Sequence, residues 1–132
     1  MSKMNFSLNA IGQIALTVQT IDAAEKFYES TLGLRKLYRF GNLVFFDCAG
    51  VRLMVDQEDK PFTPAASVIY FRTADIALTA RELKSRGVSF VDEPHLIAPM
   101  PDHDLWMTFF KDPSGNLLAL MCEAAKGYQP TA

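Results

Sequence analysis

The side chains of this chain with the clearest chemical potential lie together in one segment, EPHLIAPMPDHDLWM. It contains both histidines, His95 and His103, and the second is flanked by Asp102 and Asp104. Imidazole can act as an acid, a base or a metal ligand, and carboxylates supply oxygen ligands. Consecutive residues of an extended chain point in alternating directions, so these three neighbours do not make a metal site by themselves.

Two interpretations of this segment stay open. Residues 92–105 contain three prolines and make a long connection, and long loops in compact domains are often functional. In the functional interpretation the segment is a lid over a binding site, with His95 or His103 as the catalytic acid or base. In the structural interpretation it is a solvated loop whose His and Asp side chains cap turns.

Charge and cysteine content narrow the classes of protein. The net charge of −2 and the pI of about 5.6, without a run of like charges, predict neither a nucleic-acid nor a membrane partner. The N-terminus lacks the apolar stretch and cleavage site of a secretory signal, and we expect a cytoplasmic protein. Cys48 and Cys122 have no metal-type spacing, so we expect reduced thiols.

The elements that position these side chains occur twice. With 132 residues and 49% hydrophobic content, the chain predicts a single domain with a real core. Residues 13–18 are typical of a strand, and a helical pattern follows that starts with the capping-box spacing of Asp22 and Glu25 and ends at Gly33. Three further strands are predicted within LRKLYRF, LVFFDCAG and VRLMVD.

The second half of the chain repeats this order. Residues 68–73 predict a strand, and Asp75 is placed to cap a helix that ends at Gly87. Three strands are predicted within VSFVD, LWMTFF and NLLALM. In the turn KDPSG, Asp112 can bond back to the backbone and Gly115 can take a positive φ.

These patterns predict one α+β domain, residues 1–132, built from two tandem βαβββ modules. The expected division is a first module at 8–58, a linker at 59–66, a second module at 67–123 and a mobile tail at 124–132.

Three segments resemble the vicinal oxygen chelate superfamily, which includes glyoxalase I, bleomycin-resistance proteins and extradiol dioxygenases. They are QIALTVQTIDAAEKFYESTLGL, its repeat VIYFRTADIALTARELKSRGV, and the closing FFKDPSGNLLALMCE. The resemblance covers about residues 10–123. It implies two βαβββ modules whose sheets curl around a shared cavity, often in a homodimer, with a divalent metal bound inside in catalytic members.

The resemblance also indicates where metal ligands would lie, on the first and last strand of each module. It places Gln13 and Val68 at the first-strand positions, and Met54 (or Leu53 in the other register) and Ala119 at the last-strand positions, where Glu is usual. Only Gln13 offers an oxygen donor, and one neutral donor does not hold a divalent ion against water. We therefore expect no metal and no other cofactor.

Strand alternation predicts which side chains line the cavity, once Gln13 is taken to face inward. The predicted ligand-binding residues are Gln13, Thr17, Arg52, Met54, Tyr70, Arg72, Trp106, Ala119 and Met121. Two of them have a second interpretation. Arg72 can pair with Asp56 or a backbone carbonyl at the rim, and Trp106 can be a core aromatic with a polar tip.

The expected function is therefore binding of a small organic ligand by a homodimer. A mainly apolar wall with guanidinium groups suits an aromatic or drug-like molecule, with or without an anionic end. The alternative is an enzyme. It would be a lyase, isomerase or dioxygenase with a divalent metal in a site rebuilt around the His95–His103 loop, or a metal-free enzyme that uses one of these histidines as base.

Overall fold

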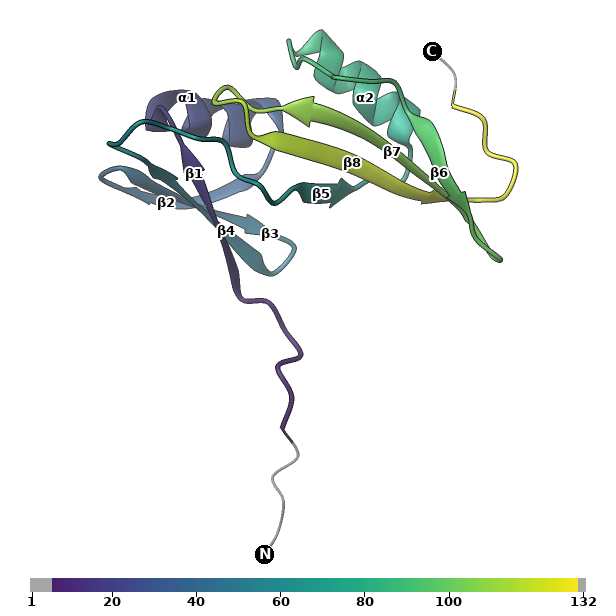
Figure 1. Cartoon of the computed structure of the whole chain (residues 1–132), viewed down its shortest axis with the longest axis horizontal. Helices are drawn as coiled ribbons and strands as arrows, with labels where there is room; N and C mark the ends of the chain where they lie inside the picture. The colour runs from purple at the N-terminus through teal and green to yellow at the C-terminus, as the bar shows by residue number, and fades with distance from the viewer. Residues whose placement is uncertain (1–5, 131–132) are drawn as a thin grey trace, which may run out of the picture.

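A computed structural model describes residues 6–130, which form two four-stranded sheets and two helices (Figure 1). Sheet 1 has the strand order β1-β4-β3-β2, in which β1 pairs with β4 in parallel and the other pairs are antiparallel. Its strands are β1 (Gln13–Val18), β2 (Arg35–Phe40), β3 (Leu43–Cys48) and β4 (Val51–Gln57).

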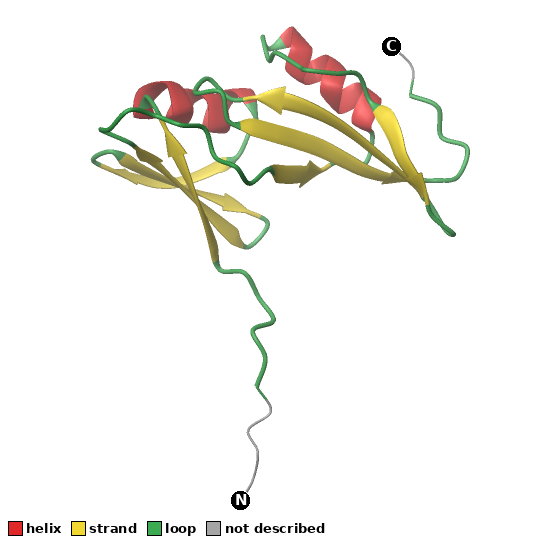
Figure 2. Cartoon of the chain, viewed as in Figure 1, coloured by secondary structure: helices red, strands yellow, loops and turns green. Residues whose placement is uncertain are grey.

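Sheet 2 repeats this topology with the order β5-β8-β7-β6, and β5 pairs with β8 in parallel. Its strands are β5 (Ile69–Arg72), β6 (His95–Pro99), β7 (Asp104–Lys111) and β8 (Leu117–Ala124). The two βαβββ modules are thus confirmed. The sheets stay separate, so in the single chain they do not close around one cavity (Figure 1). Figure 2 shows the long loop, residues 58–68, that joins β4 to β5.

The first helix starts one residue earlier than its predicted cap. It comprises α1 (Ile21–Lys26) and a π-helical turn, η1 (Phe27–Thr31). The N-cap is Thr20, without a side-chain cap bond, so the predicted capping box of Asp22 and Glu25 is wrong. Both carboxylates instead accept hydrogen bonds from Nη1 of Arg39 on β2, at 2.7 and 2.8 Å.

The second helix follows the prediction. In α2 (Ile76–Ser85) the Asp75 carboxylate accepts a hydrogen bond of 3.1 Å from the Leu78 amide, as an N-cap does. Gly87 has a φ of 90°, which a glycine adopts without steric cost, and ends the helix after Arg86. None of the described helices has the length and apolarity required to cross a membrane.

The second strand of the second module lies elsewhere than predicted. The segment VSFVD does not form a regular strand. Among its residues only Phe90 forms a β-bridge, which is an isolated one to Phe110. The backbone of this segment still pairs with β7, because the Val91 amide donates to the Phe109 oxygen at 2.9 Å and the Lys111 amide donates to the Ser89 oxygen at 3.3 Å. Beyond this short pairing, the Asp92 carboxylate accepts hydrogen bonds from the Thr108 hydroxyl at 2.7 Å and the Phe109 amide at 2.8 Å. The second strand is β6, inside the segment that the sequence indicates as a loop or lid.

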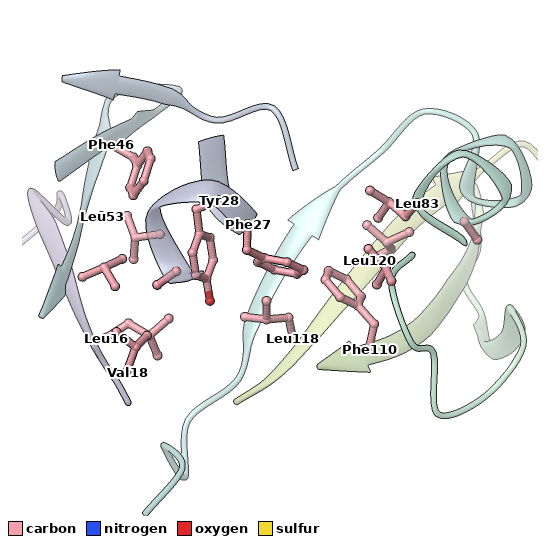
Figure 3. Close-up of a cluster of buried hydrophobic side chains, with 14 of the residues drawn as sticks. Leu16, Val18, Phe27, Tyr28, Phe46, Leu53, Leu83, Phe110, Leu118 and Leu120 are labelled. Carbon is pink, nitrogen blue, oxygen red and sulfur yellow. The ribbon is translucent and has the colours of Figure 1, made fainter. Parts of the chain in front are cut away.

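One buried cluster joins the two modules. Figure 3 shows Phe27 and Tyr28 between the apolar side chains of sheet 1 and Leu118 and Phe110 of sheet 2. Tyr28, Phe110 and Leu118 have no exposed surface. Burial of large aromatic and aliphatic side chains is the main favourable contribution to folding, so the modules stabilise each other.

The segment expected to be a mobile tail begins inside β8, at Ala124, and its described part makes specific contacts. The Tyr128 hydroxyl donates to Asp75 at 2.8 Å, and Lys126 pairs with Asp104 at 2.7 Å. These contacts tie the segment to α2 and β7. Residues 131–132 lie outside the described residues.

Candidate ligand-binding site

Each sheet has one face under its helix and one face turned away from it, which we call the open face. On β1, Leu16 and Val18 are buried on the helix side, as predicted. On β4, Leu53 is buried on that same side, which leaves Met54 on the open face. Of the two registers considered for this family position, the structure thus selects Met54.

The open face of sheet 1 carries three rows of side chains across the strands. The strand register defines them as a polar row (Gln13, Arg52, Asp47, Arg35), an apolar row (Ala15, Met54, Phe45, Tyr38) and a mixed row (Thr17, Asp56, Leu43, Phe40). All four residues predicted for this sheet, Gln13, Thr17, Arg52 and Met54, therefore share one face.

Arg52 and two aromatic rings form the centre of this face. Nε of Arg52 donates a 2.8 Å hydrogen bond to Oε1 of Gln13, and its guanidinium carbon lies 5.5 Å from the centre of the Phe45 ring. Tyr38 stacks on Phe45 with ring centres 4.6 Å apart and 28° between the planes. A cation held against an aromatic pair suits a ligand with both apolar and polar parts.

The open face of sheet 2 carries the remaining predicted residues in two rows. Tyr70, Ala119 and Phe109 form one row, and Arg72, Met121, Met107 and His95 form the next. The Tyr70 and Phe109 rings meet edge to face at 5.9 Å, and Ala119 between them is fully buried. Val68, the remaining family position, directly precedes β5.

A charged cluster lies at one end of this face. Arg72 is 3.6 Å from the carboxylate of Glu123, so it does not pair with Asp56, which bonds Thr17 at 3.4 Å. Glu123 also contacts Nε2 of His103 at 3.2 Å.

The other ring nitrogen of His103, Nδ1, lies 2.7 Å from the Asp102 carboxylate. This hydrogen bond holds the pKa of Asp102 below its usual value. His103 therefore has a carboxylate at each ring nitrogen.

The two candidate histidines are not brought together. His95 lies opposite Met107 at the start of β6, with Nδ1 2.9 Å from the backbone oxygen of Glu93. His103 lies in the turn beyond the other end of β6, after Pro99. Among residues 6–130, no three or more His, Cys, Asp and Glu side chains gather in a group that could hold a metal ion.

Trp106 lies on the helix side of sheet 2, away from the open face, which favours its interpretation as a core aromatic. It pairs with the buried Cys122 across the strands and packs edge to face on Tyr128, with ring centres 6.0 Å apart. Its Nε1 is buried without a hydrogen-bond partner among the described residues. Phe109 pairs with Ala119 across the strands and shares its open face, and alternation along β7 then places Trp106 on the opposite face.

The cysteines are poor candidates for chemistry. Cys48 and Cys122 are both free, and burial raises the pKa of each thiol. A thiol that stays protonated near neutral pH is a weak nucleophile.

Several residues of the open faces were missed from the sequence, among them Tyr38, Phe45, Phe109 and Glu123. Alternation along the last strand, continued past Met121, identifies Glu123. Phe45 and Phe109 depend on their pairing with Met54 and Ala119 across the strands, which the sequence does not give. Alternation does not identify Tyr38, because the register shifts between Lys36 and Tyr38.

The hollows of the described residues lie mainly beside the helices and the linker, and they reach the open faces at Arg72 and Thr17. One of about 450 Å³ lies between α2 and Glu93–Pro94, where the Lys84–Glu93 ion pair of 3.0 Å bounds it. Another of about 250 Å³ lies between the modules, lined by apolar side chains such as Leu32 and Phe71. The aromatic and guanidinium groups of the open face of sheet 1 line neither hollow. We choose this face as the candidate site because its side chains suit a ligand, although it is not a deep pocket.

A comparison with protein-family models agrees with the two-module fold. The model described as "Glyoxalase/Bleomycin resistance protein/Dioxygenase superfamily" matches residues 10–120. The chain belongs to this superfamily. No curated protein matches the chain.

Several solved structures share the fold of this chain. A virulence protein from Salmonella typhimurium has a TM-score of 0.75 and 22% identity, over 90% of this chain and 100% of that chain. A lactoylglutathione lyase from Agrobacterium tumefaciens has a TM-score of 0.70 and 21% identity, over 90% and 97%. A putative glyoxalase family protein from Bacillus anthracis has a TM-score of 0.74 and 20% identity, over 91% and 99%.

Proposed function

We propose that this superfamily member binds a small organic ligand with an aromatic body on the open faces of its sheets, as a homodimer and without a divalent metal. The observation that carries the proposal is the stacked pair of Tyr38 and Phe45 beside Arg52, on a face that has no helix over it. Tyr38 keeps 49% of its surface exposed, so the edge of this pair is open to a ligand. Aromatic rings bind other rings by stacking and by burial of apolar area.

The donor set at the family's metal positions supports binding without a metal. Met54, Val68 and Ala119 offer no oxygen or nitrogen ligand, and the oxygen of Gln13 already accepts a hydrogen bond from Arg52. A guanidinium this close repels a divalent cation, because like charges at a few ångströms disfavour each other. The residues therefore do not fit the superfamily's metal.

Exposed aromatic side chains support the homodimer. Phe40 is 74% exposed, and Tyr70 on the other sheet is 43% exposed. A second copy that lays its sheets over these faces would bury them and close a cavity around the ligand, which the single chain does not do. Sedimentation equilibrium tests this: Phe40→Glu, which puts a charge at that contact, is expected to shift dimer to monomer. A wild-type monomer at all concentrations would contradict the dimer.

Thermal-shift and equilibrium-dialysis screens with aromatic compounds and antibiotics test the binding function. Wild type is expected to bind at least one aromatic compound. Tyr38→Ser is expected to weaken this binding by about threefold to tenfold, since an aromatic contact contributes ~0.5–1.5 kcal/mol. Leu78→Ser is the control, because it removes an exposed apolar side chain from α2 and leaves both open faces intact. Absence of binding throughout the screen would end the proposal.

Elemental analysis of protein purified without chelator or affinity tag tests the metal. We expect well below one ion per chain, also after incubation with Ni²⁺, Zn²⁺, Mn²⁺ or Fe²⁺. Near-stoichiometric metal would contradict the metal-free site and favour the enzyme.

A metal-free enzyme is the second candidate, and the contacts of His103 favour it. With a carboxylate at each ring nitrogen, His103 is held in a fixed orientation at this end of sheet 2, where an imidazole can act as general acid or base toward a ligand. Loss of a turnover in His103→Ala, with His95→Ala as comparison, would support this candidate. Unchanged turnover in both variants would exclude it.

A further inference from the structure

Arg52 is held in one orientation by two contacts of different kinds. Its Nε is tied to Oε1 of Gln13 at 2.8 Å, and the guanidinium lies over the Phe45 ring at 5.5 Å. Gln13 is itself oriented, because its Nε2 lies 3.8 Å from the sulfur of Met54. A guanidinium fixed before binding loses less conformational freedom when it pairs with an anion.

The two terminal nitrogens of Arg52 remain available. Among residues 6–130 neither has a hydrogen-bond or ion-pair partner. Its cross-strand neighbour Asp47 is engaged elsewhere: one oxygen accepts from the Gly50 amide at 3.2 Å, and the other lies 3.8 Å from Arg35. The polar row of sheet 1 therefore has two guanidinium groups and one carboxylate, which leaves an excess positive charge.

Arg72, the other guanidinium predicted to bind ligand, is already paired with a carboxylate. The guanidinium of Arg72 lies 3.6 Å from the carboxylate of Glu123. His103 contacts this carboxylate and that of Asp102, so a second carboxylate belongs to the same cluster. An anion approaching Arg72 meets these carboxylates, whereas an anion approaching Arg52 meets a free pair of donors. Of the two, Arg52 is the better anion site.

We infer that Arg52, positioned by Gln13, binds the carboxylate of an aromatic acid whose ring lies on the neighbouring apolar row, against Met54 and Tyr38. This inference rests on the proposed ligand-binding function and names the ligand class. The two terminal nitrogens match the two oxygens of a carboxylate. Gln13, the residue at a metal-ligand position of the family, thus serves as a positioning residue for a fixed cation.

The test compares two probes of nearly the same size and shape, 2-naphthoate and 2-naphthamide, by titration calorimetry on the full chain; the amide lacks the negative charge and has an NH2 donor in place of one acceptor oxygen. Wild type is expected to bind the acid about tenfold more tightly, since a hydrogen bond to a charged group contributes more than ~1.4 kcal/mol. Arg52→Gln is expected to abolish this preference and leave the amide affinity within about twofold. Arg52→Lys, which keeps the charge without the fork, is expected to give an intermediate preference.

Arg39→Gln is the matched control, because Arg39 lies on the same sheet but pairs with Asp22 and Glu25 of α1. It removes the same charge from the helix side and is expected to keep the preference for the acid. Gln13→Leu tests positioning: the ratio of the two affinities should fall while the amide affinity stays. Gln13→Glu, which holds Arg52 but cancels its charge, should lower the ratio at least as far.

The outcomes separate the two claims. Equal binding of both probes to wild type, or an unchanged ratio in Arg52→Gln and Arg52→Lys, overturns the inference and leaves the binding function standing. A ratio lost in Arg72→Gln and kept in Arg52→Gln overturns it in favour of sheet 2. No binding of either probe at millimolar concentration overturns the inference, and the wider screen of aromatic compounds then decides the binding function.

Discussion

The hydroxyl of Tyr28 donates a hydrogen bond of 2.8 Å to the carboxylate of Asp112, across 84 residues of sequence and between the two modules. Tyr28 lies at the end of the first helix and is completely buried, and Asp112 is 5% exposed in the turn before β8. The buried carboxylate is stable there because it also accepts hydrogen bonds from the backbone amides of Ser114 and Asn116, both at 2.9 Å.

The same turn makes further contacts that join the modules. Asn116 donates through Nδ2 to the backbone oxygen of Thr17 on β1 at 2.9 Å, and its Oδ1 accepts from the Ala65 amide of the linker at 2.8 Å. The turn that begins at Asp112 thus fixes sheet 1, sheet 2 and the linker to one another. The structure confirms the predicted turn between two strands. The turn also joins the two modules, which the sequence did not indicate.

Tyr28→Phe is expected to lower the free energy of unfolding by about 2 kcal/mol, because a hydrogen bond to a buried charged group is lost. Urea unfolding measures this. Tyr38→Phe is the control: its hydroxyl has no described partner and half of the side chain is exposed, so we expect a change below about 0.5 kcal/mol. Equal effects of the two substitutions would contradict the role of the buried bond.

The pH dependence of stability should change with Tyr28. Burial, and then the nearby Asp112 carboxylate, raise the pKa of Tyr28 far above its usual value. The folded protein therefore keeps a proton that the unfolded chain loses above about pH 10. Stability is unaffected below that pH and falls above it, by up to ~1.4 kcal/mol per pH unit.

Urea unfolding of wild type and Tyr28→Phe across the alkaline range isolates this contribution. The difference in stability between the two proteins should shrink as the pH rises, since the variant lacks the group. The raised pKa of Tyr128 acts in both proteins and cancels in the comparison. Parallel curves for the two proteins would show that Tyr28 ionises in the fold as freely as in water.

Gly115→Ala is expected to destabilise the protein by about 1–2 kcal/mol, because a residue with a Cβ is strained at positive φ. Gly115 has a φ of 87°, and an added Cβ would lie 3.7 Å from Pro64, an ordinary contact, so strain and not collision sets the cost. Gly12→Ala has open space around it and no positive φ, so it should be neutral or slightly stabilising. Thermal unfolding of wild type, Gly115→Ala and Gly12→Ala measures both effects, and equal midpoints for the two variants would contradict the strain at Gly115.

Trp106→Phe tests the assignment of Trp106 to the helix side. The change removes a buried N–H that has no described partner, and this gain opposes the loss of packing against Tyr128. We expect a destabilisation below about 1 kcal/mol. Binding of 2-naphthoate should stay within about twofold of wild type, since the side chain does not reach the open face. A large loss of binding in a folded variant would return Trp106 to the site.

The sequence alone determined the two-module order and the face of most side chains. Glycines at helix ends, the Asp75 cap and the turn at Asp112 depend on neighbouring residues, and strand alternation has a fixed period of two. For these reasons β1, β4, β5 and β8 were predicted with the correct phase. The resemblance to the superfamily rested on the same local signals.

Tertiary structure decided what depends on residues distant in sequence. The regular strand beside β7 is β6 and not VSFVD, which pairs with β7 through an isolated bridge and through the side chain of Asp92. Arg52 is aimed by Gln13, a contact across 39 residues that exists only once β1 and β4 pair. Composition and periodicity do not show which side chains will be hydrogen-bond partners across two strands. These hydrogen bonds form only after the strands have paired in one register.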